Sequence, residues 1–203
     1  MLELDAQIET FALERHFTIS RGSKTETIVV VATLRDGDVV GRGECGPNGR
    51  YDETPEGVAA EIRAMAPAIR DGLTRDDLQD AMPPGAARNA LDCALWDLEA
   101  HRAGTPAWHI AGLRAPEPVI TAFTLSADGP ESMAREADSN AARPLLKLKL
   151  TGAGDLARVR AVRAAAPDVR LIVDANEAWS PETYERVVPE LQVLAVEMIE
   201  QPF

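Results

Sequence analysis

Residues 145–150 read LLKLKL, and their apolar and basic side chains alternate strictly. In a β-strand, successive side chains point to opposite faces, so Lys147 and Lys149 are expected to emerge side by side. Like charges at that distance disfavour each other's protonated form, and a lysine with a lowered pKa can act as a general base near neutral pH. The same alternation is typical of an edge strand, where lysine blocks unwanted pairing, so this stretch alone leaves both interpretations open.

Helix and strand patterns alternate along the second half of the chain. Strands are predicted at 119–125, 145–150, 169–176 and 194–200, with helices between them at 129–141, 154–167 and 180–191. Lys149, Asp174 and Glu200 stand near the ends of successive strands, at spacings of 25 and 26 residues. A repeated βα unit requires a parallel sheet, and the absence of a phosphate-type glycine fingerprint favours a (β/α)8 barrel over a doubly wound sheet. Strands inside such a sheet are covered on both faces, which weakens the edge-strand interpretation.

The first half of the chain has a different pattern. Three antiparallel strands are predicted at 7–12, 26–34 and 39–45, with a hairpin turn at Asp36-Gly37 and loops at 15–26 and 45–56. Helices are predicted from Pro55 to the glycine at 72, with Thr54 as N-cap, and from the residues after Pro84 to Gly104. The sequence therefore predicts an α+β unit in front of the βα repeat.

Composition excludes several classes of partner. The 203 residues carry a formal net charge of −12, which argues against a nucleic-acid partner or an anionic membrane surface. Cys45 and Cys93 are far apart and lack metal-ligand spacing, so they are interpreted as reduced cysteines of a cytoplasmic protein. No export signal or membrane span is recognised in the sequence.

Acidic and amide residues follow the two lysines at what would be the carboxyl rim of the barrel. Active sites are built at this rim, and Asp174 and Glu200 offer the oxygen ligands that Mg²⁺ prefers. The alternative is that these carboxylates form ion pairs with the lysines and hold no metal. Asn176 is either a turn residue that opens the next helix or a second-shell residue that orients the metal ligands.

Four stretches carry a family resemblance: LLKLKL, LIVDANEAW at 171–179, EMIEQPF at 197–203, and ARNALDCALWDLEAHRAGTPAWHIAGL at 87–113. Together they resemble the enolase superfamily and, within its muconate-lactonizing subgroup, the dipeptide epimerases. The resemblance implies an enolase-type α/β fold. An α+β capping domain at 1–115 would precede the first four β-strands of a (β/α)8 TIM barrel at 116–203.

The resemblance also implies a Mg²⁺-dependent epimerase or racemase. Lys149 would remove the α-proton of a carboxylate substrate through an enediolate, with Lys147 assisting, while Asp174 and Glu200 would bind the metal. The substrate would be a dipeptide such as Ala-Glu or an N-acyl amino acid. Arg21 is expected to bind a substrate carboxylate, and Thr124 is expected to face the same rim; a solvated loop arginine and a plain strand-end threonine are the alternatives.

The chain ends directly after the fourth predicted barrel strand. The family pattern places a third metal ligand and an opposite base on later strands, so a fragment is expected, or a partner half supplied by another chain, and a homo-oligomer is among the assemblies considered. Two other functions remain open. A cycloisomerase or dehydratase would share the first half-reaction, and a non-catalytic scaffold would keep the fold without turnover.

Overall fold

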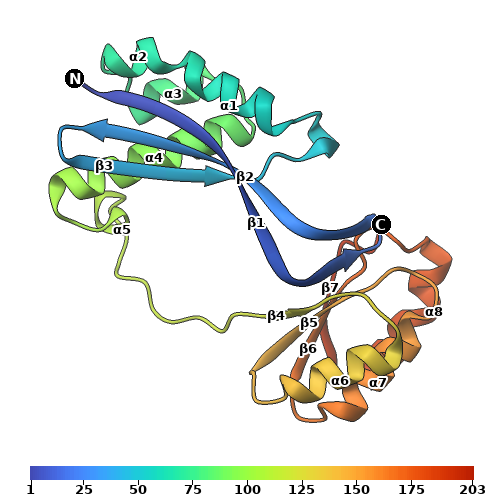
Figure 1. The fold of residues 1–203 in the computed structure, drawn as a ribbon. Helices are drawn as coiled ribbons and strands as arrows, with labels where there is room; N and C mark the ends of the chain where they lie inside the picture. The colour runs from blue at the N-terminus through green and yellow to red at the C-terminus, as the bar shows by residue number, and fades with distance from the viewer. The chain divides into compact units, whose positions relative to one another are not determined.

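The computed structural model describes residues 1–203 and divides into two compact units (Figure 1). The first unit comprises residues 1–12 and 26–117, and the second comprises residues 13–25 and 118–203. Each unit has its own cluster of buried apolar side chains. None of the helices combines the length and the apolar character that crossing a bilayer requires.

The first unit contains most of a three-stranded sheet in the order β1-β2-β3, and residues 13–25 at the β1-β2 hairpin tip belong to the second unit. Its elements are β1 (Glu3–Ile19), β2 (Gly22–Asp36), β3 (Val39–Cys45), a 3-10 turn at Gly49–Tyr51, α1 (Pro55–Ala64), α2 (Ala66–Arg70), α3 (Arg75–Ala81), α4 (Ala86–Ala103) and α5 (Ala107–Ile110). The antiparallel hairpin of β2 and β3 closes with Asp36 opposite Val39, which confirms the predicted turn.

Glycines on β3 allow α4 to approach the sheet closely. A Cβ atom added to Gly43 would lie 2.0 Å from the Ala90 carbonyl oxygen, and one added to Gly41 would lie 2.4 Å from the Ala94 carbonyl oxygen. Ala90 and Ala94 are themselves fully buried. The helix backbone therefore packs directly against the strand backbone, a contact that only glycine on the strand permits.

Two predictions for the first half of the chain are wrong. Residues 15–26 were expected to form a loop, but β1 continues to Ile19 and β2 begins at Gly22, whose φ of 148° permits the tight reversal. The helix predicted from Pro55 is broken at Met65 into α1 and α2. Pro67 explains the break, because proline has no N–H for the preceding turn and its ring clashes with that turn.

The second unit is a four-stranded parallel sheet in the order β4-β5-β6-β7, with helices along the chain between the strands (Figure 1). Its elements are β4 (Phe123–Leu125), α6 (Pro130–Ser139), β5 (Leu145–Lys149), α7 (Asp155–Ala165), β6 (Arg170–Asp174), α8 (Pro181–Val193) and β7 (Val196–Glu200). The alternation of strand and helix confirms the predicted βα repeat. Four consecutive parallel strands with helices between them are the arrangement expected for part of a (β/α)8 barrel.

The strand predicted at 119–125 is shorter than expected. Only Phe123–Leu125 pairs with β5, while Val119 and Ile120 are 85% and 55% exposed. Their β-branched side chains have strand propensity, but no neighbouring strand extends far enough to pair with them.

Candidate active site

Lys147 and Lys149 lie on β5, an inner strand that β4 and β6 flank on either side. Leu146 and Leu148 are fully buried on the opposite face of the strand. The two lysine side chains are 19% and 12% exposed. The edge-strand interpretation is therefore wrong, and the alternation in LLKLKL separates an apolar face from a charged face of the sheet.

The parallel register aligns the candidate residues of neighbouring strands. Lys149 is paired with Asp174, and Asp174 is paired with Glu200. On the other side of β5, Thr124 is paired with Lys147. Because paired residues of parallel strands point to the same face, these five side chains share the charged face of the sheet.

Two ammonium groups and two carboxylates form a connected cluster on that face. Lys147 Nζ donates to Glu200 Oε2 at 2.6 Å, and Lys149 Nζ donates to Asp174 Oδ2 at 2.6 Å. Lys147 Nζ also lies 3.3 Å from Asp174 Oδ2, so Asp174 contacts both lysines. Asp174 is 1% exposed, whereas Glu200 is 37% exposed. The four groups balance one another's charge, as buried ionised side chains require.

For Lys147, the two carboxylates overturn the expectation that the neighbouring lysine lowers its pKa. Burial lowers the pKa of Lys147, but hydrogen bonds and charge interactions with Glu200 and Asp174 outweigh it, so the pKa lies above its ordinary value. Burial likewise raises the pKa of Asp174, and the hydrogen bonds from Lys149 and from the Asn176 N–H outweigh it, so the net shift is downward. Both groups are therefore held in their ionised forms.

Asn176 lies two residues beyond Asp174 and is 5% exposed. Its backbone N–H donates to Asp174 Oδ1 at 2.9 Å, and its φ of 47° is the left-handed conformation of a turn residue. Its side-chain Nδ2 donates to Gln201 Oε1 at 3.4 Å, while Oδ1 is buried without a hydrogen-bond partner. A buried acceptor without a donor is rare and points to a missing partner such as a water or an ion.

Arg21 and Ser20 contact the segment that follows β6. Arg21 Nη1 donates to the Asn176 carbonyl oxygen at 3.0 Å and lies 3.6 Å from Glu177 Oε2. Ser20 Oγ donates to the same Asn176 carbonyl at 2.7 Å. The Arg21 side chain remains 48% exposed. The hairpin tip therefore brings a half-exposed guanidinium to the loop beyond Asp174.

Three neighbours of the cluster were not predicted from the sequence. The Phe17 ring centroid lies 5.8 Å from Lys149 Nζ, within the range of a cation–π contact, and Ser20 hydrogen-bonds the Asn176 carbonyl. Gln201 supplies a carbonyl oxygen to the Glu177 N–H at 2.8 Å. Phe17 and Ser20 were missed because residues 15–26 were interpreted as a loop. The Thr18-Ile19 pair of β-branched residues was the available strand signal.

The cluster contains donors that suit a hard divalent cation. Mg²⁺ is typically bound by one or two carboxylates and keeps other positions for water and substrate oxygens. Asp174 and Glu200 supply two carboxylates, and two residues beyond Asp174 the side-chain Oδ1 of Asn176 is buried without a hydrogen-bond partner. No group of three or more His, Cys, Asp or Glu side chains is arranged to hold a metal ion. Two carboxylates match the number that Mg²⁺ typically takes from a protein, and in this structure both accept hydrogen bonds from the lysines.

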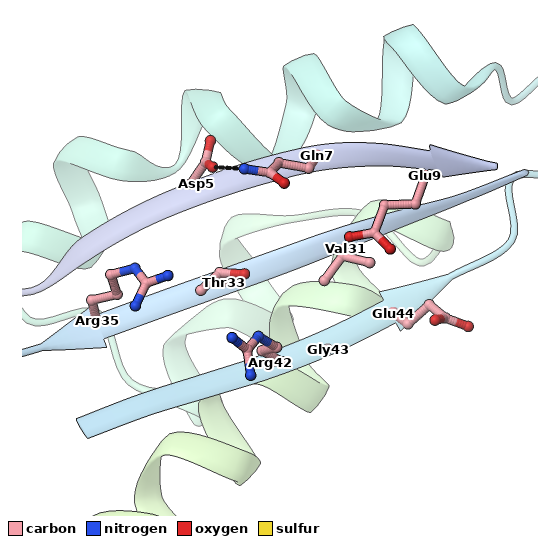
Figure 2. A pocket seen from close by; sticks show the side chains of 9 residues that line it. All are labelled: Asp5, Gln7, Glu9, Val31, Thr33, Arg35, Arg42, Gly43 and Glu44. Carbon is pink, nitrogen blue, oxygen red and sulfur yellow. Dashed lines mark hydrogen bonds between the residues drawn. The ribbon is translucent and has the colours of Figure 1, made fainter. Parts of the chain in front are cut away.

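A separate polar groove of about 490 Å³ lies on the three-stranded sheet of the first unit (Figure 2). It is lined by Asp5, Gln7, Glu9, Val31, Thr33, Arg35, Arg42, Gly43 and Glu44. Figure 2 shows these side chains spread along three strands, with one hydrogen bond of 2.9 Å between Gln7 and Asp5. The groove contains none of the predicted site residues and brings no nucleophile to a base, so we place the candidate site at the lysine cluster.

Comparison with protein-family models matches both units. The model of the mandelate racemase and muconate lactonizing enzyme N-terminal domain matches residues 5–112. The model described as enolase C-terminal domain-like matches residues 132–203. The matched ranges cover the three-stranded sheet with its helices and most of the parallel βα repeat.

Matches to related proteins extend over nearly the whole chain. The L-Ala-D/L-Glu epimerase of Escherichia coli K12 is 44% identical over 196 residues, which are 96% of this chain and 61% of the relative. An enolase family member from Agrobacterium tumefaciens, described as having homology to dipeptide epimerases and solved with sodium and L-Ala-L-Glu, is 50% identical with a TM-score of 0.96. That match covers 100% of this chain and 62% of the solved chain.

A third relative was solved with a magnesium ion. The dipeptide epimerase of Enterococcus faecalis V583, complexed with Mg and L-Leu-L-Tyr, is 30% identical with a TM-score of 0.88. The match covers 98% of this chain and 60% of that chain. The chain thus spans about three fifths of the length of these relatives.

Proposed function

This chain belongs to the mandelate racemase and muconate lactonizing enzyme family of the enolase superfamily, and on that premise we propose that the intact protein is a Mg²⁺-dependent epimerase or racemase. It would invert the α-carbon beside the carboxylate of a dipeptide such as Ala-Glu or of an N-acyl amino acid. The observation that carries the proposal is the cluster of Lys147, Lys149, Asp174 and Glu200 on one sheet face. The relatives of this chain include an L-Ala-D/L-Glu epimerase and a dipeptide epimerase.

The roles proposed for the two parts of the chain are those that the family resemblance implies. Residues 1–115 would act as the capping domain, and residues 116–203 would supply the first four strands of the barrel. Inversion through a planar intermediate needs a proton donor on the face opposite the first base, and these 203 residues place one pair of lysines on a single strand. The returning donor in this proposal is a further group on the opposite face of the substrate, which the lysine pair of β5 does not supply.

In this proposal Lys149 Nζ accepts the α-proton. To do so it must first lose one of its own protons to solvent, and Asp174 Oδ2 at 2.6 Å is the group that orients its Nζ. Lys147 would stay protonated, and its Nζ lies 2.6 Å from Glu200 Oε2 and 3.3 Å from Asp174 Oδ2. It would donate to the substrate carboxylate while Lys149 acts as the base.

Asp174 and Glu200 would hold the Mg²⁺, and Asn176 would orient the metal shell, since its backbone N–H donates to Asp174 Oδ1. When bound, the ion supplies positive charge that offsets the negative charge developing on the substrate carboxylate. Arg21 would bind a second carboxylate of the substrate, such as that of a glutamate side chain, because its guanidinium is a planar bidentate donor. Thr124 would contact the substrate from β4, since it is paired with Lys147.

The test follows α-proton exchange in the intact protein. L-Ala-L-Glu, L-Ala-D-Glu and N-acetylglutamate are incubated in D₂O with and without Mg²⁺, and loss of the α-proton signal is followed by NMR. We expect Mg²⁺-dependent exchange with inversion. Exchange without inversion would favour a cycloisomerase or dehydratase. No metal-dependent exchange across a broad dipeptide panel would refute the proposal and favour a scaffold without turnover.

The role of Lys149 is tested by Lys149→Ala in the same assay. Loss of a general base lowers the rate by about 10²–10⁴-fold, and only the enantiomer that Lys149 deprotonates should stop exchanging. Arg135→Ala on α6 is the matched control, because Arg135 is an exposed cation of the same unit outside the cluster. Exchange of both enantiomers at the wild-type rate in Lys149→Ala would remove Lys149 from the mechanism.

A further inference from the structure

A buried carboxylate outside the proposed site lies at the start of α7. Asp155 is 3% exposed, and its oxygens accept hydrogen bonds from four donors. The backbone N–H groups of Thr151 and Gly152 donate at 3.0 and 2.8 Å. Trp179 Nε1 donates at 2.7 Å and Arg158 Nη1 at 3.0 Å. All four donors are N–H groups, and the two oxygens of an ionised carboxylate can accept all four hydrogen bonds at once.

The two backbone donors show what Asp155 organises. Thr151 and Gly152 precede α7 and belong to the loop that follows β5. A residue that only caps the helix would accept from the first N–H groups of the helix itself. Asp155 instead folds the loop beyond Lys149 back onto its own side chain. Its carboxylate therefore fixes the chain directly after β5.

Trp179 extends this connection to the two following strands. It is 5% exposed and lies in the segment after β6. Its indole N–H reaches Asp155, while its backbone N–H donates to the Pro202 carbonyl oxygen at 3.0 Å. Pro202 follows β7. One residue thus joins the segments that follow β5, β6 and β7.

These three segments directly follow the charged residues of the candidate site. Lys149 is the last residue of β5, Asp174 the last of β6 and Glu200 the last of β7. We propose that Asp155 and Trp179, the Asp155–Trp179 clasp, are positioning residues that hold these three strand ends in the geometry that proton abstraction needs. The inference rests on the proposed function, and it assigns neither residue a contact with substrate or metal.

The expected effect on the rate follows from how small a displacement of the reacting groups an active site tolerates. A displacement of about 1 Å at the reacting groups can cost about 10²-fold in rate. Trp179→Phe keeps most of the ring and removes the N–H, while Asp155→Asn keeps the size and replaces one acceptor oxygen by a donor. In the intact protein we expect kcat for α-proton exchange to fall about 10-fold or more in both variants. KM should stay within about two-fold, because the substrate contacts are unchanged.

Ser180→Ala is the matched control for a merely structural role. Ser180 neighbours Trp179, and its Oγ accepts a hydrogen bond from the Thr183 N–H at 3.2 Å as the N-cap of α8. Its loss removes the two hydrogen bonds between Ser180 Oγ and Thr183 from the same segment and leaves the hydrogen bonds of Asp155 in place. We expect Ser180→Ala to lower the melting temperature about as much as the two clasp variants do. At a temperature where all variants are folded, it should leave kcat unchanged. An equal fall of kcat in Ser180→Ala would overturn the positioning role.

Amide hydrogen exchange tests the clasp without reference to activity. The Thr151 and Gly152 amides should exchange at least about 10-fold faster in Trp179→Phe than in Ser180→Ala. Unchanged protection of these amides would overturn the inference, as would wild-type kcat in both clasp variants. Wild-type protein that exchanges no substrate would refute the proposed function, while the amide result would still decide whether the clasp holds the loop. If Asp155→Asn does not fold, Trp179→Phe carries the test alone.

Discussion

Replacing Gly43 by alanine tests the close packing of α4 on the three-stranded sheet. The new Cβ atom would lie 2.0 Å from the Ala90 carbonyl oxygen and 2.5 Å from the Ala94 nitrogen. Cβ atoms essentially never approach a neighbour closer than 3.0 Å, so strand and helix must separate by at least 1.0 Å. Both neighbours are backbone atoms, so no side-chain rotation can relieve the contact.

The size of the effect follows from this geometry. Overpacking a core typically costs about 1–3 kcal/mol, and a clash with a rigid helix backbone belongs at the upper end, so we expect about 3 kcal/mol. Gly46→Ala is the matched control, because nothing lies within 4 Å of its added Cβ and its φ is not positive. At such a site, replacing glycine by alanine stabilises the fold by up to about 1 kcal/mol, because it reduces the conformational entropy of the unfolded chain. The two variants should therefore differ by about 3–4 kcal/mol.

The assay must separate the two units, because a chain with two cores need not unfold in one step. Hydrogen exchange followed by mass spectrometry on the intact protein resolves β3 and α4 from the parallel sheet. Gly43→Ala should lose protection in β3 and α4, with the unfolding transition of that unit lowered by about 12–24 °C at about 4–8 °C per kcal/mol for a domain of about 100 residues. Equal stability of Gly43→Ala and Gly46→Ala would refute the close-packing argument.

Three further predictions concern the two cores and the cysteines. Leu148→Ala should cost about 2–5 kcal/mol in denaturant unfolding, because Leu148 is fully buried, whereas Leu113→Ala, at a side chain 64% exposed, should change stability by less than about 0.5 kcal/mol; equal losses would contradict the assigned core. Burial raises the pKa of Cys45 from 9.0 to about 11, so its contribution to stability is complete below pH 9 and lost by pH 11. The free energy of unfolding should therefore fall by about 1–2 kcal/mol over this range after solvent screening. Cys45→Ala should remove this pH dependence, and a pH dependence that persists would belong to another group. Cys93 is exposed and Cys45 is buried, so a thiol reagent should label Cys93 first, and equal labelling rates would contradict the burial of Cys45.

The charged cluster could be predicted because its signals are local and periodic. Alternation in LLKLKL places two lysines on one face, and the spacing of about one βα unit brings Asp174 and Glu200 to the same level of the sheet. In a parallel sheet, this spacing is enough to align the charged residues of neighbouring strands. The direction of the Lys147 pKa shift could not be predicted, because it depends on carboxylates that arrive within 2.6 and 3.3 Å from strands distant in sequence.

The parts that the sequence did not reveal depend on tertiary contacts. The hairpin tip at 15–26 has polar composition and a glycine, both typical of loops, and only its pairing makes it a strand. The interaction of Asp155 with Trp179 joins residues 24 positions apart through one side-chain hydrogen bond, which leaves no periodic trace. The groove on the first unit likewise arises from three strands whose outward side chains read as an ordinary solvated face.

The order of the parallel strands along the chain is also their order in the sheet. A ribosome adds about 5–20 residues per second, so strands spaced by one βα unit emerge about 1–5 s apart. β5 delivers two ammonium groups, β6 then brings the carboxylate of Asp174 to both of them, and β7 adds Glu200 beside Lys147. Synthesis in this direction supplies each new negative charge to positive charges that are already in place.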